Sequence, residues 1–225
     1  MTTVRSAMIF AAGFGTRMGE LTANTPKPLV PLAGRPMIDY TIDLLYAAGI
    51  TQIVANVHYL AEQMAAHVET RGVTVAHEAD CILDTGGGLR AALPLLGDGP
   101  VITINPDVFW HGTNPISFLM SEWKSSMTSL LLLIPKERAL GTDHVGDFML
   151  DSTIIRREGP FLFSGAQILR TDDIDRISDD VFSLNAYWDL LARDNHLQGV
   201  AYPDTWCDIG TPRGLTQAEA LIADV

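Results

Sequence analysis

The chain has 225 residues, a hydrophobic content of 47% and a formal net charge of −12 at pH 7. This length allows one domain with a sizeable core, and an acidic chain without a run of Lys or Arg is a poor match for a nucleic-acid-binding protein. No segment reaches the roughly 18 apolar residues of a membrane helix, so no membrane partner is expected, and two cysteines without metal-type spacing, Cys81 and Cys207, favour reduced thiols in a cytoplasmic protein.

The first half of the chain alternates predicted strands with predicted helices. Short apolar runs predict buried strands, and apolar residues at helical spacing predict the helices between them. The predicted strands are 7–10, 51–57, 73–76 and 101–104, and the predicted helices are 37–48, 60–71 and 85–96. Because helices connect consecutive buried strands, this order predicts an α/β fold with a doubly wound, mainly parallel sheet.

The second half has a different pattern, in which short strands are more frequent. Helices are predicted at 116–124, 181–194 and 215–222, strands at 128–134, 148–150, 154–156, 161–169 and 199–202, and a loop at 139–147. The short strands between 148 and 169 are typical of a small, partly antiparallel region. No repeat, low-complexity tract or linker divides the sequence, so residues 1–225 are predicted to form a single domain.

The most informative stretch is residues 7–31, in which a predicted strand leads into a loop of small residues. Gly13 and Gly15 lack a Cβ, so the backbone there can approach an anion closely and offer it N–H groups. Arg17 and Lys27 add positive charge to the same stretch, and Lys27 stands between two prolines. The pattern therefore predicts a phosphate-binding loop.

Three common phosphate loops do not match this stretch. The P-loop string G-x-x-x-x-G-K-[ST] does not occur in the sequence. The dinucleotide fingerprint G-x-G-x-x-G fails because Gly19 comes one residue too late, and the partner motifs of a kinase glycine loop are missing. A simple tight turn is the remaining alternative, although a bare turn requires neither Arg17 nor the Pro-Lys-Pro segment.

The string A-A-G-x-G-T-R-M at 11–18, followed by T-P-K-P-L-V-P at 25–31, resembles the signature of the sugar-1-phosphate nucleotidyltransferases. The resemblance implies a Rossmann-like, GT-A-like fold without the C-terminal β-helix of larger relatives. It also implies that 1–110 form a nucleotide-binding half and 111–225 a sugar-binding half. The implied contacts of the nucleoside triphosphate in this loop are Ala12, Gly13, Gly15, Thr16, Arg17 and Lys27.

Two aspartates lie in later motifs that the resemblance marks as metal ligands. Asp107 follows the predicted strand 101–104 in a segment where the family has N-G-D, with Pro106 in place of the glycine. Asp208 lies in W-C-D-I-G-T, which resembles the family's W-x-D-x-G-T. Carboxylates near the carboxyl end of a parallel strand suit Mg²⁺, which prefers oxygen ligands. The alternative for each aspartate is a structural role, in a turn or beside a helix cap.

The segment Asp84-Thr85-Gly86-Gly87-Gly88 is predicted to begin a helix, although glycine inside a helix costs roughly 1 kcal/mol relative to alanine. Close approach of a base and ribose is one reason for such glycines, and tight packing of the helix is another. In the family this segment contacts the nucleobase, so Asp84, Thr85 and Gly86 are implied nucleotide contacts. The related string E-T-G-G-G is typical of the branch that resembles the N-acetylmuramate-1-phosphate uridylyltransferases of cell-wall (peptidoglycan) recycling.

The resemblance also implies four sugar contacts, Asn105, Asp147, Ser164 and Gly165. By themselves, the short G-D and S-G pairs that contain three of these residues are more often turns. A sugar that carries a carboxylate needs a cation or backbone donors in its pocket, and Arg156 or Arg157 is the candidate cation. The sequence does not choose between these two arginines.

The implied reaction transfers a nucleoside monophosphate from an NTP to a sugar 1-phosphate by Mg²⁺-assisted in-line displacement. Its implied catalytic residues are Arg17, Lys27, Asp107 and Asp208. The D-T-G-G-G string and the short chain favour UTP and N-acetylmuramic acid 1-phosphate. Open alternatives are a guanylyl-, cytidylyl- or uridylyltransferase for mannose, heptose or glucose 1-phosphate or phosphocholine, and a non-catalytic subunit that binds a nucleotide sugar. The oligomeric state is left open.

Overall fold

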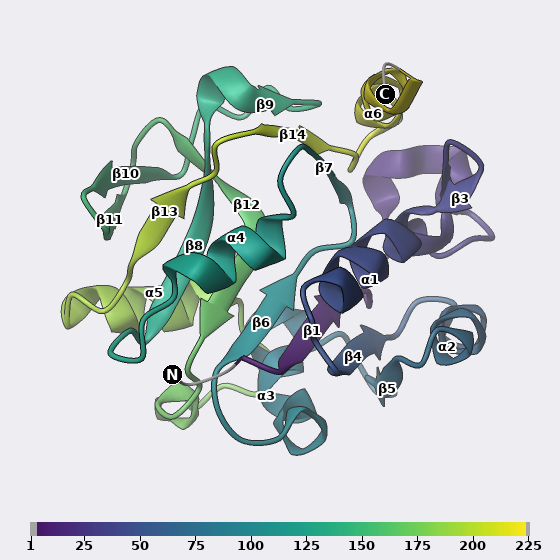
Figure 1. The fold of residues 1–225 in the computed structure, drawn as a ribbon. Helices are drawn as coiled ribbons and strands as arrows, with labels where there is room; N and C mark the ends of the chain where they lie inside the picture. The colour runs from purple at the N-terminus through teal and green to yellow at the C-terminus, as the bar shows by residue number, and fades with distance from the viewer. Residues whose placement is uncertain (1–3, 224–225) are drawn as a thin grey trace.

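The computed structural model describes residues 4–223, and a nine-stranded β-sheet lies at its centre (Figure 1). The strand order is β11-β10-β12-β6-β1-β4-β5, and β8 pairs with both β12 and β13. Strands of the first half pair in parallel, namely β1 (Ser6–Phe10), β4 (Gln52–Val57), β5 (Thr74–His77) and β6 (Val101–Ile104). These strands and the helices between them confirm the predicted α/β fold with its parallel sheet.

Helices cover both faces of this sheet. The five that do so are α1 (Met37–Ala47), α2 (Ala61–Thr70), α3 (Asp84–Leu96), α4 (Pro115–Glu122) and α5 (Leu184–Arg193). Buried residues of α1, α2 and α4 form one core with Ala7 and Ile9 of β1, whereas those of α3 and α5 form a second core with Met8. Successive residues of a strand point to opposite faces, so β1 contributes to a core on each side of the sheet.

The second half of the chain joins the same sheet through an antiparallel strand. β12 (Phe161–Leu169) lies between β6 and β8 (Ser129–Pro135) and runs antiparallel to both. β10 (Phe148–Asp151) and β11 (Ile154–Arg157) form an antiparallel hairpin, and β13 (Gly199–Ala201) pairs with β8 in parallel. The expected antiparallel strands of the second half are therefore present, in one continuous sheet with the parallel strands.

A separate three-stranded sheet was not predicted from the sequence. β7 (Val108–His111) pairs antiparallel with β14 (Thr205–Asp208), and β14 pairs in parallel with β9 (Ala139–Leu140). β9 lies in the segment 139–147, so the prediction of an unbroken loop there was wrong. The three strands are short and their partners are distant in the sequence, so no local periodicity announces them.

The remaining elements are short, apart from the terminal helix. They are η1 (Thr16–Thr22), η2 (Lys27–Leu29), η3 (Lys136–Arg138) and η4 (Ile174–Arg176), which are 3-10 helices, the pair β2 (Pro31–Leu32) and β3 (Arg35–Pro36), and α6 (Pro212–Ala223). α6 begins earlier than the predicted 215, since proline fits the first helical position. Within residues 4–223 the helices include none with both the length and the apolar character needed to cross a membrane.

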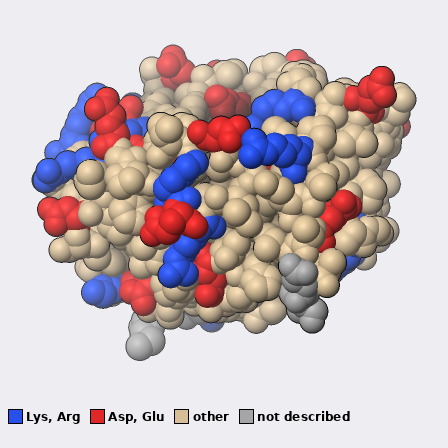
Figure 2. Space-filling view, turned by 90° about the horizontal axis from the view of Figure 1, so that it is seen from above, with Lys and Arg blue, Asp and Glu red and all other residues tan. Residues whose placement is uncertain are grey.

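Both cysteines are unpaired, as the sequence analysis expected, and acidic side chains lie next to basic ones on the surface. Cys81 and Cys207 are both free thiols, and burial, followed by the charge of Asp208, raises the pKa of Cys207 to about 12. Figure 2 shows basic and acidic side chains next to one another on one face of the molecule. Eight of the 15 Lys and Arg residues form ion pairs with carboxylates, so much of the positive charge is locally neutralised.

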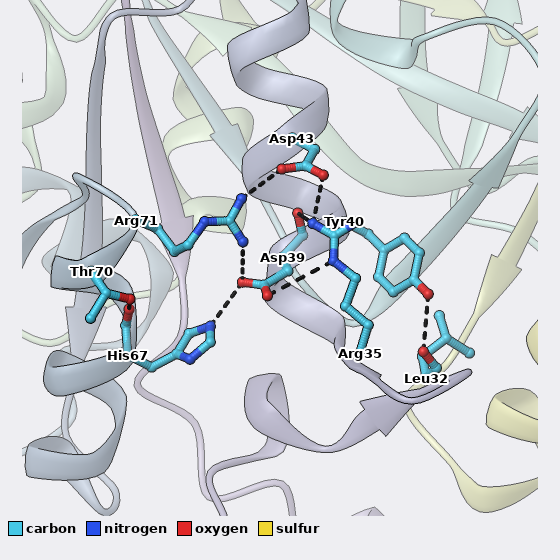
Figure 3. Close-up of polar contacts among 8 residues, drawn as sticks. All are labelled: Leu32, Arg35, Asp39, Tyr40, Asp43, His67, Thr70 and Arg71. Carbon is cyan, nitrogen blue, oxygen red and sulfur yellow. Dashed lines mark hydrogen bonds and ion pairs between the residues drawn. The ribbon is translucent and has the colours of Figure 1, made fainter.

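A buried carboxylate connects α1 with α2 (Figure 3). Oδ1 of Asp39 lies 2.8 Å from Nη1 of Arg71 and 2.8 Å from Nε2 of His67, and the residue is only 7% exposed. Asp43, one turn further along α1, pairs with Arg71 at 2.7 Å and with Arg35 at 2.5 Å. Partial burial by itself raises the pKa of Asp43, but hydrogen bonds from the two arginines bring it below its ordinary value.

We expect Asp39→Asn to lower the free energy of unfolding by roughly 1.5–3 kcal/mol, the usual contribution of a hydrogen bond to a charged group. The amide keeps the shape of the carboxylate but loses the charge that Arg71 faces. Urea denaturation measures the loss. Asp43→Asn is the matched control and should cost much less, because its side chain is 50% exposed and solvent screens its ion pairs. Equal losses of unfolding free energy in the two variants would show that burial of Asp39 does not strengthen its ion pairs.

Candidate active site

The loop after β1 is fixed in shape by Gly15. Its φ is +67°, a conformation that favours glycine, and a Cβ at this position would lie 2.7 Å from Cβ of Lys27. The hydroxyl of Thr22 donates hydrogen bonds to the carbonyl oxygens of Gly15 (3.0 Å) and Gly19 (3.1 Å). The loop and Lys27 are therefore packed together with no space for a side chain at residue 15.

This loop lines one wall of a cavity of about 330 Å³, and the start of α3 and the segment after β6 line another. Small-molecule sites have volumes of this order, and in parallel sheets they lie at the carboxyl ends of the strands, as here. The cavity brings together most of the predicted nucleotide-site residues. Those that line it are Ala12, Gly13, Gly15, Thr16, Arg17, Lys27, Asp84, Thr85, Asn105 and Asp107.

The pairing of β7 with β14 places Asp107 and Asp208 at the same end of the small sheet. Asp208 is opposite Val108 in the register, and the backbone N–H of Ile209 donates to the carbonyl oxygen of Asp107 at 3.0 Å. Nζ of Lys27 forms an ion pair with Oδ2 of Asp107, and the Lys27 side chain is 12% exposed. Lys27 and Asp107 therefore line the cavity as an ion pair, and Asp208 lies beside Asp107 without lining the cavity itself.

The electrostatics of Asp208 fit a bound cation. Burial raises its pKa, and the charge of Asp107 raises it further, although the N–H of Gly210 donates to Oδ1 at 2.7 Å and opposes this rise. Residues 4–223 contain no cluster of three or more His, Cys, Asp or Glu side chains arranged to hold a metal ion. Two carboxylates completed by phosphate oxygens are a usual site for Mg²⁺, so the donor set of Asp107 and Asp208 suits this ion.

A buried hydrogen-bond network that the sequence analysis missed supports the walls of the cavity. Oδ1 of Asn56 accepts the N–H of Ala11 at 2.8 Å, and its Nδ2 donates to Oε1 of Glu78 at 2.6 Å. Oε2 of Glu78 accepts the N–H of Leu83 at 2.8 Å. The network thus connects the phosphate loop with the start of α3. The signal in the sequence that could have revealed this network was Asn56, a polar residue near the end of a buried apolar strand.

Tight protein packing explains the glycines that begin α3. A Cβ on Gly86 would lie 2.3 Å from the ring of Phe182, and one on Gly88 would lie 2.6 Å from Oε1 of Glu78. The N–H groups of Gly86 and Gly87 donate to the carbonyl oxygen of Phe182 at 2.9 and 3.1 Å. Gly86 lines neither this cavity nor the one beside it. Tight packing, the alternative to the close approach of a base, therefore accounts for Gly86 and Gly88, while a nucleotide contact at Gly86 stays a prediction.

A second cavity, of about 210 Å³, shares Phe10, Asp84, Thr85 and Asn105 with the first, so the two are adjacent. Further lining residues are Gln167, Asn185 and Trp188, none of which the sequence analysis selected. Gln167 is fully buried, and its side chain bonds to Thr103 Oγ1 at 3.0 Å and to Trp188 Nε1 at 2.8 Å. An oriented indole and buried polar groups therefore line this cavity.

The predicted sugar contacts divide into two pairs. Asn105 and Gly165 line the second cavity, and the N–H of Asn105 donates to the carbonyl oxygen of Gly165 at 2.9 Å. Ser164 is fully buried, and Asp147 accepts the N–H of Phe163 at 2.8 Å. Ser164 and Asp147 line neither cavity. Ser164 Oγ accepts the N–H of Ala166 at 3.1 Å, the turn-like role that its short motif left open, whereas Asp147 also contacts Nε2 of His144 at 2.7 Å.

A family model described as the MobA-like NTP transferase domain matches residues 7–158, which is more than half of the chain. The chain belongs to this family. Two relatives of this NTP transferase are named N-acetylmuramate alpha-1-phosphate uridylyltransferase. The one from Caulobacter vibrioides is 35% identical over 234 aligned residues, which cover 97% of each chain. The one from Neisseria meningitidis is 34% identical over 226 residues, which cover 96% of this chain and 97% of the relative.

A solved inositol-1-phosphate CTP transferase from T. maritima has the same fold as this NTP transferase. The TM-score is 0.81 at 15% identity, and the match covers 99% of this chain and 97% of the other. The expected GT-A-like fold is thereby confirmed. The family match and the relatives confirm the resemblance to the sugar-1-phosphate nucleotidyltransferases, and with it the expected enzyme class.

Arg17 of this NTP transferase lies at the solvent side of the cavity. Its side chain is 62% exposed, and Nη1 is 4.0 Å from Oδ2 of Asp208. A Cβ on Gly210 would lie 2.8 Å from Nη2 of Arg17, so glycine at this position leaves room for the guanidinium. The exposed and weakly paired guanidinium is free to bind an incoming phosphate with its planar set of donors.

We expect Arg17→Ala to raise KM for the nucleoside triphosphate roughly 10- to 100-fold, because a charge-assisted hydrogen bond contributes about 1.5–3 kcal/mol. The KM for the sugar phosphate should change much less. Steady-state kinetics with each substrate varied in turn measures both values. Arg193→Ala, at an exposed arginine that ends α5, is the matched control and should leave both unchanged. Equal KM values in wild type and Arg17→Ala would show that Arg17 does not bind the triphosphate.

Proposed function

We propose that this NTP transferase transfers the uridylyl group of UTP to N-acetylmuramic acid 1-phosphate and releases pyrophosphate. The observation that carries the proposal is that the phosphate loop and the Lys27–Asp107 ion pair line one cavity, with Asp208 beside Asp107. The names of the two relatives at 34 and 35% identity support the choice of both substrates.

In the proposed reaction, an oxygen of the sugar phosphate attacks the α-phosphorus of UTP. The new O–P bond forms while the bond from the α-phosphorus to the bridging oxygen breaks, and the electron pair leaves with pyrophosphate. Such a displacement depends on positioning and charge neutralisation and needs no covalent enzyme intermediate. Arg17 holds the departing phosphates, and Lys27 approaches the transferred phosphoryl group. Mg²⁺ held by Asp107 and Asp208 supplies further neutralisation of phosphate charge when bound.

The two cavities offer separate places for the two substrates. We assign the triphosphate and uridine to the cavity lined by the phosphate loop, Asp84 and Thr85, and the sugar to the cavity lined by Gly165 and Trp188. Asn105 lines both cavities and stands two residues before Asp107. This arrangement directs the 1-phosphate of the sugar toward the α-phosphorus of the nucleotide, as in-line attack requires.

A substrate grid tests the proposal. Purified protein is assayed for pyrophosphate release with each of the four NTPs against 1-phosphates of N-acetylmuramic acid, N-acetylglucosamine, glucose, mannose and heptose, and against phosphocholine. UTP with N-acetylmuramic acid 1-phosphate should give the highest kcat/KM. A pair such as GTP with mannose 1-phosphate that is tenfold faster would overturn the substrate assignment. Binding of nucleotide sugars without pyrophosphate release from any pair would instead identify a non-catalytic subunit.

A further inference from the structure

One cation lies at the edge of the second cavity without lining it. Arg157 is the last residue of β11, and its guanidinium carbon is 5.3 Å from the ring centroid of Trp188 and 5.1 Å from that of Phe148. Its Nη2 lies 3.3 Å from the carbonyl oxygen of Asn185. Because Trp188 and Asn185 both line the cavity, the guanidinium touches two residues of its wall.

The Arg157 guanidinium is held in place, but not all of its N–H donors form hydrogen bonds. Nε and Nη2 donate to a single oxygen of Asp189, at 3.2 and 3.0 Å, and Nη2 also reaches Asn185. Nη1 makes no hydrogen bond to the residues that the structure describes. An arginine has five N–H donors, so Arg157 keeps donors for a second anion while its ion pair with Asp189 remains. Its side chain is 38% exposed and is therefore accessible to a ligand.

Arg156, the other arginine of β11, is placed differently. Adjacent residues of a strand point to opposite faces, and Arg156 is exposed and opposite Met149 in the hairpin, whereas Arg157 is opposite the buried Phe148. Within residues 4–223 no hydrogen bond or ion pair holds the Arg156 side chain. It is therefore a matched control with the same charge at the neighbouring position.

We propose that Arg157 is a specificity-determining residue that binds the carboxylate of an acidic sugar phosphate in the second cavity. This inference rests on the proposed function, because the anion assigned to Arg157 is the lactyl carboxylate of N-acetylmuramic acid. The chain is acidic overall, so an anionic sugar substituent requires a local cation, and a guanidinium fixed on an aromatic ring forms directional bonds to a carboxylate. The same sugar without the lactyl group would leave Arg157 with only its contacts to Asp189 and Asn185.

Kinetics with the two sugars test the inference. We expect Arg157→Gln to raise KM for N-acetylmuramic acid 1-phosphate roughly 10- to 100-fold, the effect of one lost charge-assisted contact. The KM of N-acetylglucosamine 1-phosphate, or its inhibition constant where turnover is slow, should change less than about twofold. Arg157→Lys keeps the charge and should recover part of the loss, and Arg156→Gln should resemble wild type.

The outcomes separate this inference from the proposed function. If wild-type protein does not use UTP with N-acetylmuramic acid 1-phosphate, the proposed function fails first. If it does, and Arg157→Gln weakens both sugars equally, Arg157 only supports the shape of the pocket through Trp188 and the inference is overturned. An equal loss in Arg156→Gln and Arg157→Gln would also overturn it, because a general charge effect then explains the result.

Discussion

Turnover should fall about 10³-fold or more in Asp107→Asn and in Asp208→Asn, each measured with saturating substrates and Mg²⁺. The two carboxylates are the ligands that we assign to the metal, and the metal's neutralisation of phosphate charge is worth several kcal/mol, where each 1.4 kcal/mol corresponds to a factor of ten. Asp151→Asn, at an exposed aspartate that ends β10, should retain wild-type turnover. Wild-type rates in either of the first two variants would remove the metal assignment.

Asp208→Asn should also remain folded, so that its lost turnover does not result from unfolding. The pKa of Asp208 is raised in the folded protein by burial and by Asp107, so the stability linked to its protonation is present at low pH and declines as pH rises through the folded pKa. Near neutral pH the ionised carboxylate therefore destabilises the metal-free protein, and the uncharged amide should not. With a chelator present, Tm of Asp208→Asn should equal or exceed that of wild type, and the difference should grow from about pH 4 upward.

Lys27→Met should lower kcat by about 10²- to 10³-fold, the usual effect of losing one group that stabilises charge in the transition state. Lys27 is largely buried beside Asp107, where low solvent exposure strengthens its interaction with a phosphoryl group. Methionine fills a similar volume without the charge. Steady-state and single-turnover rates should fall together if the chemical step is affected.

Lys27→Arg distinguishes charge from shape at this position. The Lys27 side chain is 12% exposed and its Nζ pairs with Asp107, so the larger planar guanidinium would have to rearrange this largely buried position, and we expect only partial recovery of kcat. A Lys27→Met variant with a raised KM and an unchanged kcat would contradict a role in the transition state, since it would indicate uniform binding of substrate and transition state.

The part of the fold that contains the glycine loop after β1 could be predicted because its information is local. The apolar run of β1, the glycines after it and the alternation of helices with buried strands each reflect the conformational preference of a short segment. For the same reason the helices α1, α2 and α3 were found within one residue of their observed bounds. The motif around Arg17 and Lys27 indicated the family, and both residues line the cavity.

Only some of the residues that line the second cavity could be predicted from the sequence. Asn105 and Gly165 were found through motifs, but Gln167, Asn185 and Trp188 come from one strand and one helix that meet only in the folded chain. Each of these residues has an ordinary sequence context. Their common role arises from packing of α5 against β12, so no pattern within either segment identifies it.

By itself, the sequence determined the layered fold, the phosphate loop and the identity of the charged residues, because backbone preferences and motifs are carried by neighbouring residues. Only the tertiary structure decided how those residues meet. The antiparallel register of β7 with β14 brings Asp208 to Asp107, and the packing of Phe182, Asp180 and Glu78 against α3 leaves no room for a Cβ on its three glycines. Both depend on contacts between segments that are distant in the chain, and the free energy of such contacts is set by burial in three dimensions, which a local pattern does not contain.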